Sequence, residues 1–445
     1  TRKESSAASD VYKRQVVIRP SEDASILNPE GNGYSISMRQ ALLVFLPFAC
    51  GYFLSYLFRS VNAVIAPNLI SEFDLSASQL GLLTSVYFLT FASLQIPIGL
   101  FLDRFGPRRV NATLLILASI GALIFSKADD FQTLLLGRAF IGFGVAACLM
   151  SSIKIFSQWF PKEKLPEMTG RIMFVGGLGA ISATAPVEFM LSFTGWRELF
   201  VALFFATVIA SAIIFFFAPD KKNIHDIGST KDQLLGALNV YKAPIFWRIA
   251  LGSVLPQAFN MSVQGLWAGP WLSDVAGLER SGVALHLFAL GMATMLGFLF
   301  WGAFATRMSR RGIQPIVVLI WATIAYMALQ LLLVFEVTQM SWVIWIGWGL
   351  LGTSGSLAFS IISHSFPAHL TGRATTALNL LAFLTAFASQ WLFGIILNQW
   401  DALDGGGYAP EGYVQAFSIF LVLQVLGFTW MFRGYLKDRH AQKAL

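Results

Sequence analysis

The chain has 445 residues, of which 56% are hydrophobic and 12% charged, and its mean hydropathy is +0.65. Soluble domains carry about 25% charged residues, so this composition excludes an ordinary water-soluble enzyme and predicts that much apolar surface faces lipid. The net charge of +7 does not indicate a nucleic-acid-binding surface, because the basic residues lie in short loops between apolar runs.

The chain begins with a polar N-terminal tail over residues 1–38. Residues 1–15 resemble translated adaptor sequence, so we treat them as not native and leave them out of the fold. Cys50 and Cys148 lie in different apolar runs and form no cluster typical of a metal site. We therefore expect neither a metal nor a cofactor.

Twelve apolar runs follow, each near the roughly 20 residues that a membrane-spanning helix needs. The first six lie near 41–66, 79–101, 110–127, 131–156, 168–190 and 198–218. The other six lie near 248–272, 281–305, 314–335, 341–365, 373–397 and 413–434. Lipid offers the backbone no hydrogen-bond partner, so every run is predicted to be helical. The prediction is an all-α membrane protein with twelve transmembrane helices in two six-helix bundles.

A polar stretch divides the runs into an N-terminal bundle over 39–218 and a C-terminal bundle over 248–436. Residues 219–247 are predicted to be a cytoplasmic linker with a short amphipathic helix near 231–241, and residues 437–445 a cytoplasmic tail. The outer loops that follow from this arrangement carry three basic and twelve acidic residues. This bias predicts that both termini are cytoplasmic.

The two bundles contain matching sequences. Residues 99–109 (GLFLDRFGPRR) correspond to a segment that begins at Gly302 (GAFATRMSRR), 203 positions later. The Thr-Gly-Arg at 169–171 recurs at 371–373, 202 positions later. Two matches at nearly the same offset indicate a duplicated six-helix unit.

This organisation resembles the major facilitator superfamily over about residues 39–436. The family's loop motif G-x-x-x-D-R-x-G-x-R-R is matched in full by Gly99, Asp103, Arg104, Gly106, Arg108 and Arg109. Residues 134–144, which include Arg138, resemble the family's fourth-helix motif, and Gly195-Trp196-Arg197 is a further shared element. The resemblance implies a carrier that works by alternating access, with the first, fourth, seventh and tenth helices around a central cavity.

Two departures from the family pattern affect the expected function. Thr306 replaces the motif aspartate in the second copy, so an acidic gating role rests on Asp103 alone. The residues around Pro186 match the family's fifth-helix antiporter motif poorly, which argues against drug/proton antiport.

Three of the four expected cavity helices, the first, seventh and tenth, carry polar residues on one face. In the first and seventh helices these residues recur at intervals of three and four positions. The tenth has only a softer series of serines over 354–363. The residues predicted to bind substrate are Tyr52, Tyr56, Arg59, Asn62, Arg138, Gln257, Asn260, Gln264 and Trp267. For the amides, hydrogen bonds between helices are an equally good explanation.

Arg59 and Arg138 are the main candidates for direct substrate contact. Arg59 lies about 10 Å from the outer end of its helix, and an uncompensated arginine at such depth costs several kcal/mol. No Asp or Glu lies equally deep, so we expect an anionic group of the substrate to pair with them. The alternatives are a coupling or packing role for Arg138, and snorkelling of Arg59 toward headgroups.

The resemblance implies that the loop motif is a gate at the inner surface rather than a substrate site. Its gating residues would be Gly99, Asp103, Arg104, Gly106, Arg108, Arg109 and the partner position Gly372. Asp103 is expected to meet the N-terminal end of the eleventh helix near Gly372 when the outer side is open. Such a charge–dipole contact contributes about 0.3–2 kcal/mol.

The leading hypothesis is a monomeric secondary transporter that moves a small organic anion or zwitterion by proton symport. No ATP-binding motif is present, so an ion gradient is the expected energy source, with Glu188 and His364 as candidate coupling groups. The alternative is efflux of hydrophobic compounds by proton antiport. A membrane enzyme is disfavoured because no nucleophile–base set converges, and a channel is disfavoured by the duplicated halves.

Overall fold

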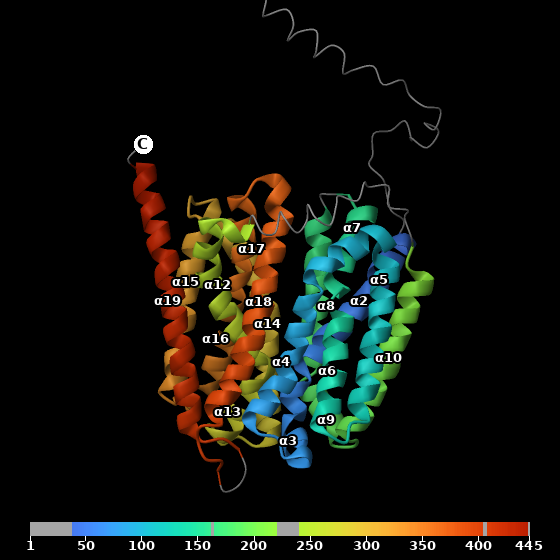
Figure 1. Cartoon of the computed structure of the whole chain (residues 1–445). Helices are drawn as coiled ribbons and strands as arrows, with labels where there is room; N and C mark the ends of the chain where they lie inside the picture. The colour runs from blue at the N-terminus through green and yellow to red at the C-terminus, as the bar shows by residue number, and fades with distance from the viewer. Residues whose placement is uncertain (1–37, 162–163, 220–239, 404–406, 444–445) are drawn as a thin grey trace, which may run out of the picture. The chain divides into compact units, whose positions relative to one another are not determined.

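The computed structural model describes residues 38–161, 164–219, 240–403 and 407–443. Residues 39–445 belong to one compact unit. All regular elements in the described part are helical (Figure 1). The predicted linker helix near 231–241 falls almost wholly outside the described residues.

The N-terminal bundle comprises α2 (Met38–Ser60), α3 (Asn62–Phe73), α4 (Ala77–Ser93), α5 (Gln95–Ser126), α6 (Phe131–Val145), α7 (Cys148–Trp159), α8 (Leu165–Ser182), α9 (Ala185–Leu191) and α10 (Trp196–Phe217). The C-terminal bundle comprises α12 (Pro244–Ser262), η2 (Val263–Trp267), α13 (Ala268–Asp274), α14 (Arg280–Ser309), α15 (Pro315–Val334), α16 (Ser341–Gly352), η3 (Thr353–Ser356), α17 (Leu357–Ser365), α18 (Ala368–Leu397) and α19 (Pro410–Lys443).

Ten helices in the described part are long and apolar enough to cross a membrane. The other two predicted spans are helical but divided: 79–101 is split between α4 and α5, and 248–272 runs through α12, η2 and α13. Within α5 a kink at Gly106, with φ of 79°, separates the second predicted span from the third. The helical membrane fold is confirmed, and the count of twelve spans stays a prediction.

Local sequence signals explain where several helices begin. At α4, the backbone N–H of Gln79 donates to Ser76 Oγ (3.3 Å), and the backbone N–H of Ser76 donates to Gln79 Oε1 (3.0 Å). This reciprocal pair is a capping box. At α6, the Thr133 amide donates to Asp130 Oδ1 (2.8 Å), and this bond lowers the pKa of that exposed carboxyl group. α12 and α15 each begin with a proline, whose fixed φ suits the first helical turn.

The four expected cavity helices are all interrupted midway. α2 gives way to α3 at Val61, and α6 to α7 at Ala146–Ala147. In the C-terminal bundle the π-helix η2 and the 3-10 helix η3 mark the corresponding positions. Irregular backbone at membrane depth is tolerated where protein or a cavity covers it. These breaks therefore point to the middle of the bundles as the place of a site.

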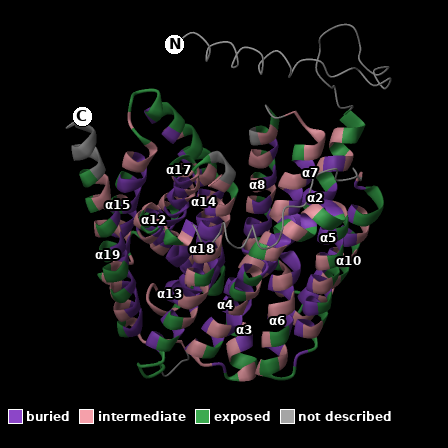
Figure 2. Cartoon of the chain, turned by 45° about the horizontal axis from the view of Figure 1, so that its top comes forward, coloured by how far each residue is buried: buried purple, intermediate pink, exposed green. Residues whose placement is uncertain are grey.

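Large apolar side chains on the outer faces of the bundles are exposed, while buried residues gather between the helices (Figure 2). On α10 the exposed residues include Phe205, Ile209 and Phe216, and on α19 they include Val422, Leu426 and Trp430. Water would disfavour so large an apolar surface. It is the surface expected of a protein surrounded by lipid.

The bundles have two ends, at which different connections lie. The loop motif and the α17–α18 connection lie at one end, called the motif end (Figure 1). The turn after α3 and the α13–α14 connection lie at the opposite end, called the α3 end.

Candidate functional site

A cavity of about 500 Å³ lies between the two bundles, within the size range of small-molecule sites. It is lined mainly by α2, α4 and α8 on one side and by α12, α14, η3 and α18 on the other. It extends to Gly170 of α8 and to Thr375 and Thr376 of α18, toward the motif end. A side-chain carbon added at Gly170 or Gly372 would meet nothing within 4 Å, so both positions face open space.

At the α3 end the bundles are in close contact. A side-chain carbon at Gly394 of α18 would lie 2.3 Å from the Ala77 carbonyl oxygen, and one at Gly81 of α4 would lie 2.9 Å from the Gln390 carbonyl oxygen. Only glycine allows such approach of two helix backbones. The cavity is thus closed toward the α3 end and accessible from the motif end.

Polar contacts also cross between the bundles at the α3 end. Arg280, at the start of α14, forms an ion pair with Glu188 of α9 (Nε–Oε1, 2.5 Å) and donates a hydrogen bond to Asn68 Oδ1 of α3 (2.9 Å). Asn398, just after α18, donates to Ser78 Oγ of α4 (2.8 Å).

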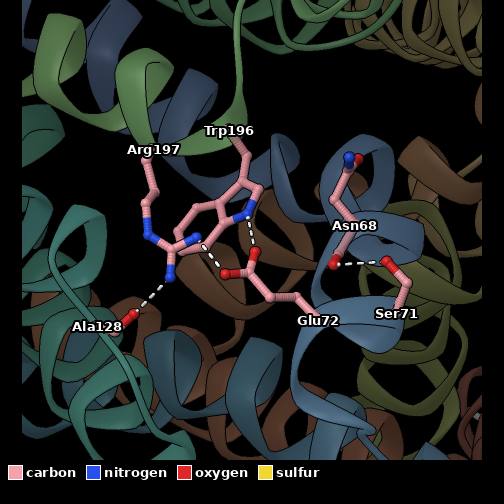
Figure 3. Close-up of polar contacts among 6 residues, drawn as sticks. All are labelled: Asn68, Ser71, Glu72, Ala128, Trp196 and Arg197. Atoms are coloured by element: carbon pink, nitrogen blue, oxygen red, sulfur yellow. Dashed lines mark hydrogen bonds and ion pairs between the residues drawn. The ribbon is translucent and has the colours of Figure 1, made fainter.

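The α3 helix is in turn held to its own bundle by Glu72 (Figure 3). This carboxylate accepts a hydrogen bond from Trp196 Nε1 (2.8 Å) and forms an ion pair with Arg197, which also donates to the Ala128 carbonyl oxygen (2.8 Å). The Arg197 guanidinium lies 4.2 Å from the centre of the Trp196 ring. The Gly-Trp-Arg element of the sequence thus holds α3 in place through Glu72, and α3 also carries Asn68, which contacts Arg280.

Arg59 lies at the end of α2 and contributes its side chain to the cavity lining. The guanidinium carbon is 5.3 Å from the Tyr56 ring centre and 5.5 Å from the Phe88 ring centre. Among the described lining residues it is the one charged side chain, and no carboxylate pairs with it there. The positive charge therefore faces the cavity uncompensated.

Arg138 does not line the cavity in this conformation. Its side chain is buried, donates to the carbonyl oxygens of Phe58 (2.6 Å) and Arg59 (3.4 Å), and lies 4.9 Å from the Tyr87 ring centre. The last carbonyls of a helix lack intrahelical partners, so Arg138 satisfies the end of α2 where the chain breaks. It braces the backbone that carries Arg59.

Six of the nine residues predicted to bind substrate line the cavity: Tyr52, Tyr56, Arg59, Gln257, Asn260 and Gln264. Besides Arg138, the two that do not are buried between helices. Asn62 donates to Thr84 Oγ1 (3.3 Å), and Trp267 donates to the Gln390 carbonyl oxygen (3.0 Å) while stacking on Phe393.

The sequence reasoning missed two cavity amides, Gln95 and Asn379. Asn379 Nδ2 of α18 donates to Gln95 Oε1 of α5 (2.9 Å), so they join the two bundles at the cavity wall. Both belong to helices outside the four expected to line the cavity. Their signal was a single amide inside a mostly apolar run.

The residues predicted to form a gate lie at the motif end. Asp103 pairs with Lys154 of α7 (2.6 Å), within its own bundle. Arg108 donates to the Ala218 carbonyl oxygen (3.3 Å), and the Arg104 guanidinium lies 5.3 Å from the Phe105 ring centre. Arg109 and Gly99 are exposed, as is Gly372, while Gly106 is buried at the kink. The expected contact between Asp103 and the start of α18 stays a prediction.

Neither candidate coupling group lines the cavity. Glu188 forms the ion pair with Arg280, and exposed His364 lies with Nδ1 2.7 Å from the Ser360 carbonyl oxygen. No group of three His, Cys, Asp or Glu able to hold a metal occurs in the part of the chain that the structure describes.

Several curated proteins are similar to this chain. The probable sulfoacetate transporter SauU of Cupriavidus necator is 24% identical over 273 residues, 58% of this chain and 64% of that protein. The probable L-galactonate transporter of Escherichia coli K12 is 21% identical over 365 residues, 78% and 80% of the two chains. The hexuronate transporter of the same organism is 23% identical over 274 residues, 57% and 62%. The chain thus spans less than two thirds of the length of two of these relatives.

Solved structures share the fold. A bacterial homolog of the human lysosomal transporter Spinster, in an inward-facing and unoccupied conformation, has a TM-score of 0.73 at 20% identity, covering 91% of this chain and 99% of that one. A D-xylose-proton symporter has a TM-score of 0.68 at 14% identity, covering 88% and 97%. The profile of the Major Facilitator Superfamily matches residues 48–390. The chain belongs to the Major Facilitator Superfamily.

Proposed function

We propose that this secondary transporter binds a small organic anion or zwitterion at Arg59 and carries it across a bacterial inner membrane by alternating access. The observation that carries the proposal is the uncompensated Arg59 guanidinium in the cavity between the bundles. A guanidinium offers paired donors that match a carboxylate, sulfonate or phosphate. An anionic substrate would supply the charge that the described lining lacks.

The named relatives support an acidic substrate. Proteins similar to this chain are described as transporters of sulfoacetate, L-galactonate and hexuronate, all of which carry an acidic group. At identities of 21–24%, the substrate of one relative is not assigned to this chain. Their common feature is an anion on a small organic molecule, which is what Arg59 suits.

The conformation supports alternating access. The cavity is accessible from the motif end and closed at the α3 end, and the positive-inside bias of the sequence favours a cytoplasmic motif end. This would be the inward-facing member of a pair of states. Among the described lining residues there is no carboxylate or histidine, so a coupling proton would have to bind elsewhere. We propose Glu188, whose pairing with Arg280 ties the two bundles together, as that group.

The test is substitution of Arg59 in purified protein reconstituted into liposomes. With an anion found by thermal stabilisation, Arg59→Gln is expected to reduce counterflow at least tenfold, because the buried charge-assisted contact is lost. Arg59→Lys keeps the charge without the paired donors and should retain intermediate activity. Arg171→Gln, an exposed arginine paired with Glu167, is the matched control and should behave as the unmodified protein. Full counterflow in Arg59→Gln would remove the anion-binding role.

The apolar part of the cavity wall favours a second function, efflux of hydrophobic compounds. This part is formed by aromatic and methionine side chains, among them Phe91, Phe298, Phe359, Phe383, Met150 and Met295. Cationic dyes and organic anions, compared in one thermal-stabilisation panel, separate the two functions. Stabilisation by dyes and by none of the anions would replace the leading proposal with efflux.

A further inference from the structure

The C-terminal side of the cavity presents amide groups rather than charges. Gln257 and Asn260 of α12 both line the cavity, and Asn260 is 4% exposed. Gln257 Oε1 and Asn260 Oδ1 are buried, and neither has a hydrogen-bond partner among the described residues. A buried polar atom without a partner is costly, so these two mark positions where a ligand can supply the missing hydrogen bond.

The backbone around these amides leaves them little freedom. A side-chain carbon added at Gly352 of α16 would lie 2.2 Å from Asn260 Oδ1, and one at Gly355 of η3 would lie 2.9 Å from Gln257 Oε1. A larger residue at Gly352 or Gly355 would therefore displace the amide that lies opposite it. The interruption of α16 by η3 brings this glycine-bearing backbone against α12. The two amides belong to a shaped wall rather than to a loose surface.

The chemistry of an amide selects the group that can satisfy it. Each amide carries a donor and an acceptor, and a hydroxyl group can both donate and accept, so it matches an amide in either orientation. An ammonium group can only donate, and it needs an anionic partner when buried. The described lining contains no carboxylate to hold an ammonium group. The wall therefore suits hydroxyl groups better than the cationic end of a zwitterion.

We propose that the substrate is a hydroxylated organic monoanion, whose acidic group binds Arg59 and whose hydroxyl groups bind Gln257 and Asn260. The anionic end rests on the function proposed above. The hydroxyl end rests on the separate observation of two unpartnered amides opposite glycines. Specificity then arises from both bundles, because one supplies the charge and the other supplies the hydroxyl contacts.

A matched ligand series tests this. Purified protein is titrated with a set of four- to seven-carbon polyhydroxy acids of different stereochemistry, with the unsubstituted carboxylates, with ω-amino acids of equal length, and with the corresponding uncharged polyols. Thermal stabilisation gives the half-saturating concentration of each compound. At least one polyhydroxy acid is expected to bind about a hundredfold more tightly than its unsubstituted carboxylate, because a site built for hydroxyl groups rejects an analogue that lacks them.

Substitutions identify which contacts are responsible. Gln257→Met and Asn260→Leu keep the side-chain volume and remove the amide, and each should weaken binding of the polyhydroxy acid about five- to tenfold. The difference in affinity between the polyhydroxy acid and its unsubstituted carboxylate should therefore shrink by that factor in each variant. Gln424→Met removes a buried amide that lies outside the cavity and donates to Gln330, so it controls for a general loss of stability.

The outcomes separate the two proposals. If unsubstituted carboxylates bind as well as polyhydroxy acids and Arg59→Gln abolishes both, the anion site stands and the hydroxyl inference fails. If ω-amino acids bind best, the substrate is a zwitterion and the inference fails. If polyols bind as well as polyhydroxy acids in Arg59→Gln, the anion site fails and the hydroxyl contacts stand. If no compound in the series binds, the inference is overturned.

Discussion

The two ends of the molecule differ in how the bundles meet. At the α3 end, Arg280 contacts Glu188 and Asn68, and Asn398 contacts Ser78. The backbones of α4 and α18 also approach each other closely there, at glycine positions. At the motif end, Asp103 pairs with Lys154 of its own bundle, and Gly170 and Gly372 face open space. A carrier needs two sets of contacts of similar strength that cannot form together. The described conformation shows one set formed, and the motif contains groups suited to the other.

The largest expected effect comes from making the α3 end unable to open. A cysteine pair, Ser78→Cys with Asn398→Cys, replaces side chains whose Oγ and Nδ2 atoms lie 2.8 Å apart. Exposed Cys50 is first replaced by serine. A short thiol-reactive cross-linker should reduce transport more than tenfold, because the bundles can no longer separate there, and reduction of the cross-link should restore it.

Binding separates a locked carrier from a damaged one. Ligand added to detergent-solubilised cross-linked protein should still bind, since the cavity is accessible from the motif end. Each single-cysteine variant treated with the same reagent is the control. Unchanged transport in fully cross-linked protein would show that the α3 end does not open during the cycle.

The next effect concerns the motif end. Asp103→Asn should slow transport about three- to tenfold with substrate affinity unchanged, because a carboxylate at a helix N-terminus contributes about 0.3–2 kcal/mol to the state in which this end is closed. Initial rates in proteoliposomes and the half-saturating ligand concentration measure the two quantities. Thr306→Val is the matched control, since Thr306 occupies the equivalent position of the second motif copy without a charge. Equal slowing in both variants would assign the effect to the loop structure rather than to the Asp103 charge.

The sequence predicted the helical architecture well because lipid imposes a simple rule on apolar runs. It also predicted Arg59, Gln257 and Asn260 at the cavity, since charged and amide groups deep in a helix need water or a partner. It did not distinguish Arg59 from Arg138. Both are arginines at similar depth, and only the geometry shows that Arg138 is satisfied by the Phe58 carbonyl oxygen.

Contacts between distant segments were the least predictable part. Arg280 lies in a predicted outer loop, and nothing in its neighbourhood along the chain indicates that it meets Glu188, 92 positions earlier (280 minus 188). The pairing of Gln95 with Asn379 is similar, because it depends on how the two bundles are docked. The spacing of residues along the sequence assigns a residue to a face of its helix. The packing of the two bundles against each other determines which residues that face contacts.

The smallest expected effect comes from the Arg280–Glu188 pair. Its side chains are 46% and 21% exposed, and exposed pairs contribute about 0.2–1 kcal/mol, which corresponds to a change in populations of about 1.4- to fivefold. Glu188→Gln should therefore favour opening of the α3 end, so that the motif end is closed more of the time. The measurement is the rate at which a hydrophilic maleimide labels Gly372→Cys, which should fall by about 1.4- to fivefold. Glu167→Gln breaks a pair with Arg171 inside one helix and should leave the labelling rate unchanged.

The same substitution decides whether the pair also couples transport to protons. If Glu188 only holds the bundles together, exchange of substrate across the membrane and uptake driven by a pH gradient should change by the same small factor. If Glu188 carries the coupling proton, Glu188→Gln should abolish gradient-driven uptake while exchange continues, because a neutral amide cannot release a proton. Arg280→Gln removes the ion pair and the contact with Asn68 but leaves the Glu188 carboxyl group in place. Loss of gradient-driven uptake in Glu188→Gln but not in Arg280→Gln would therefore assign coupling to the carboxyl group itself, and equal behaviour of the two variants would assign only a structural contact.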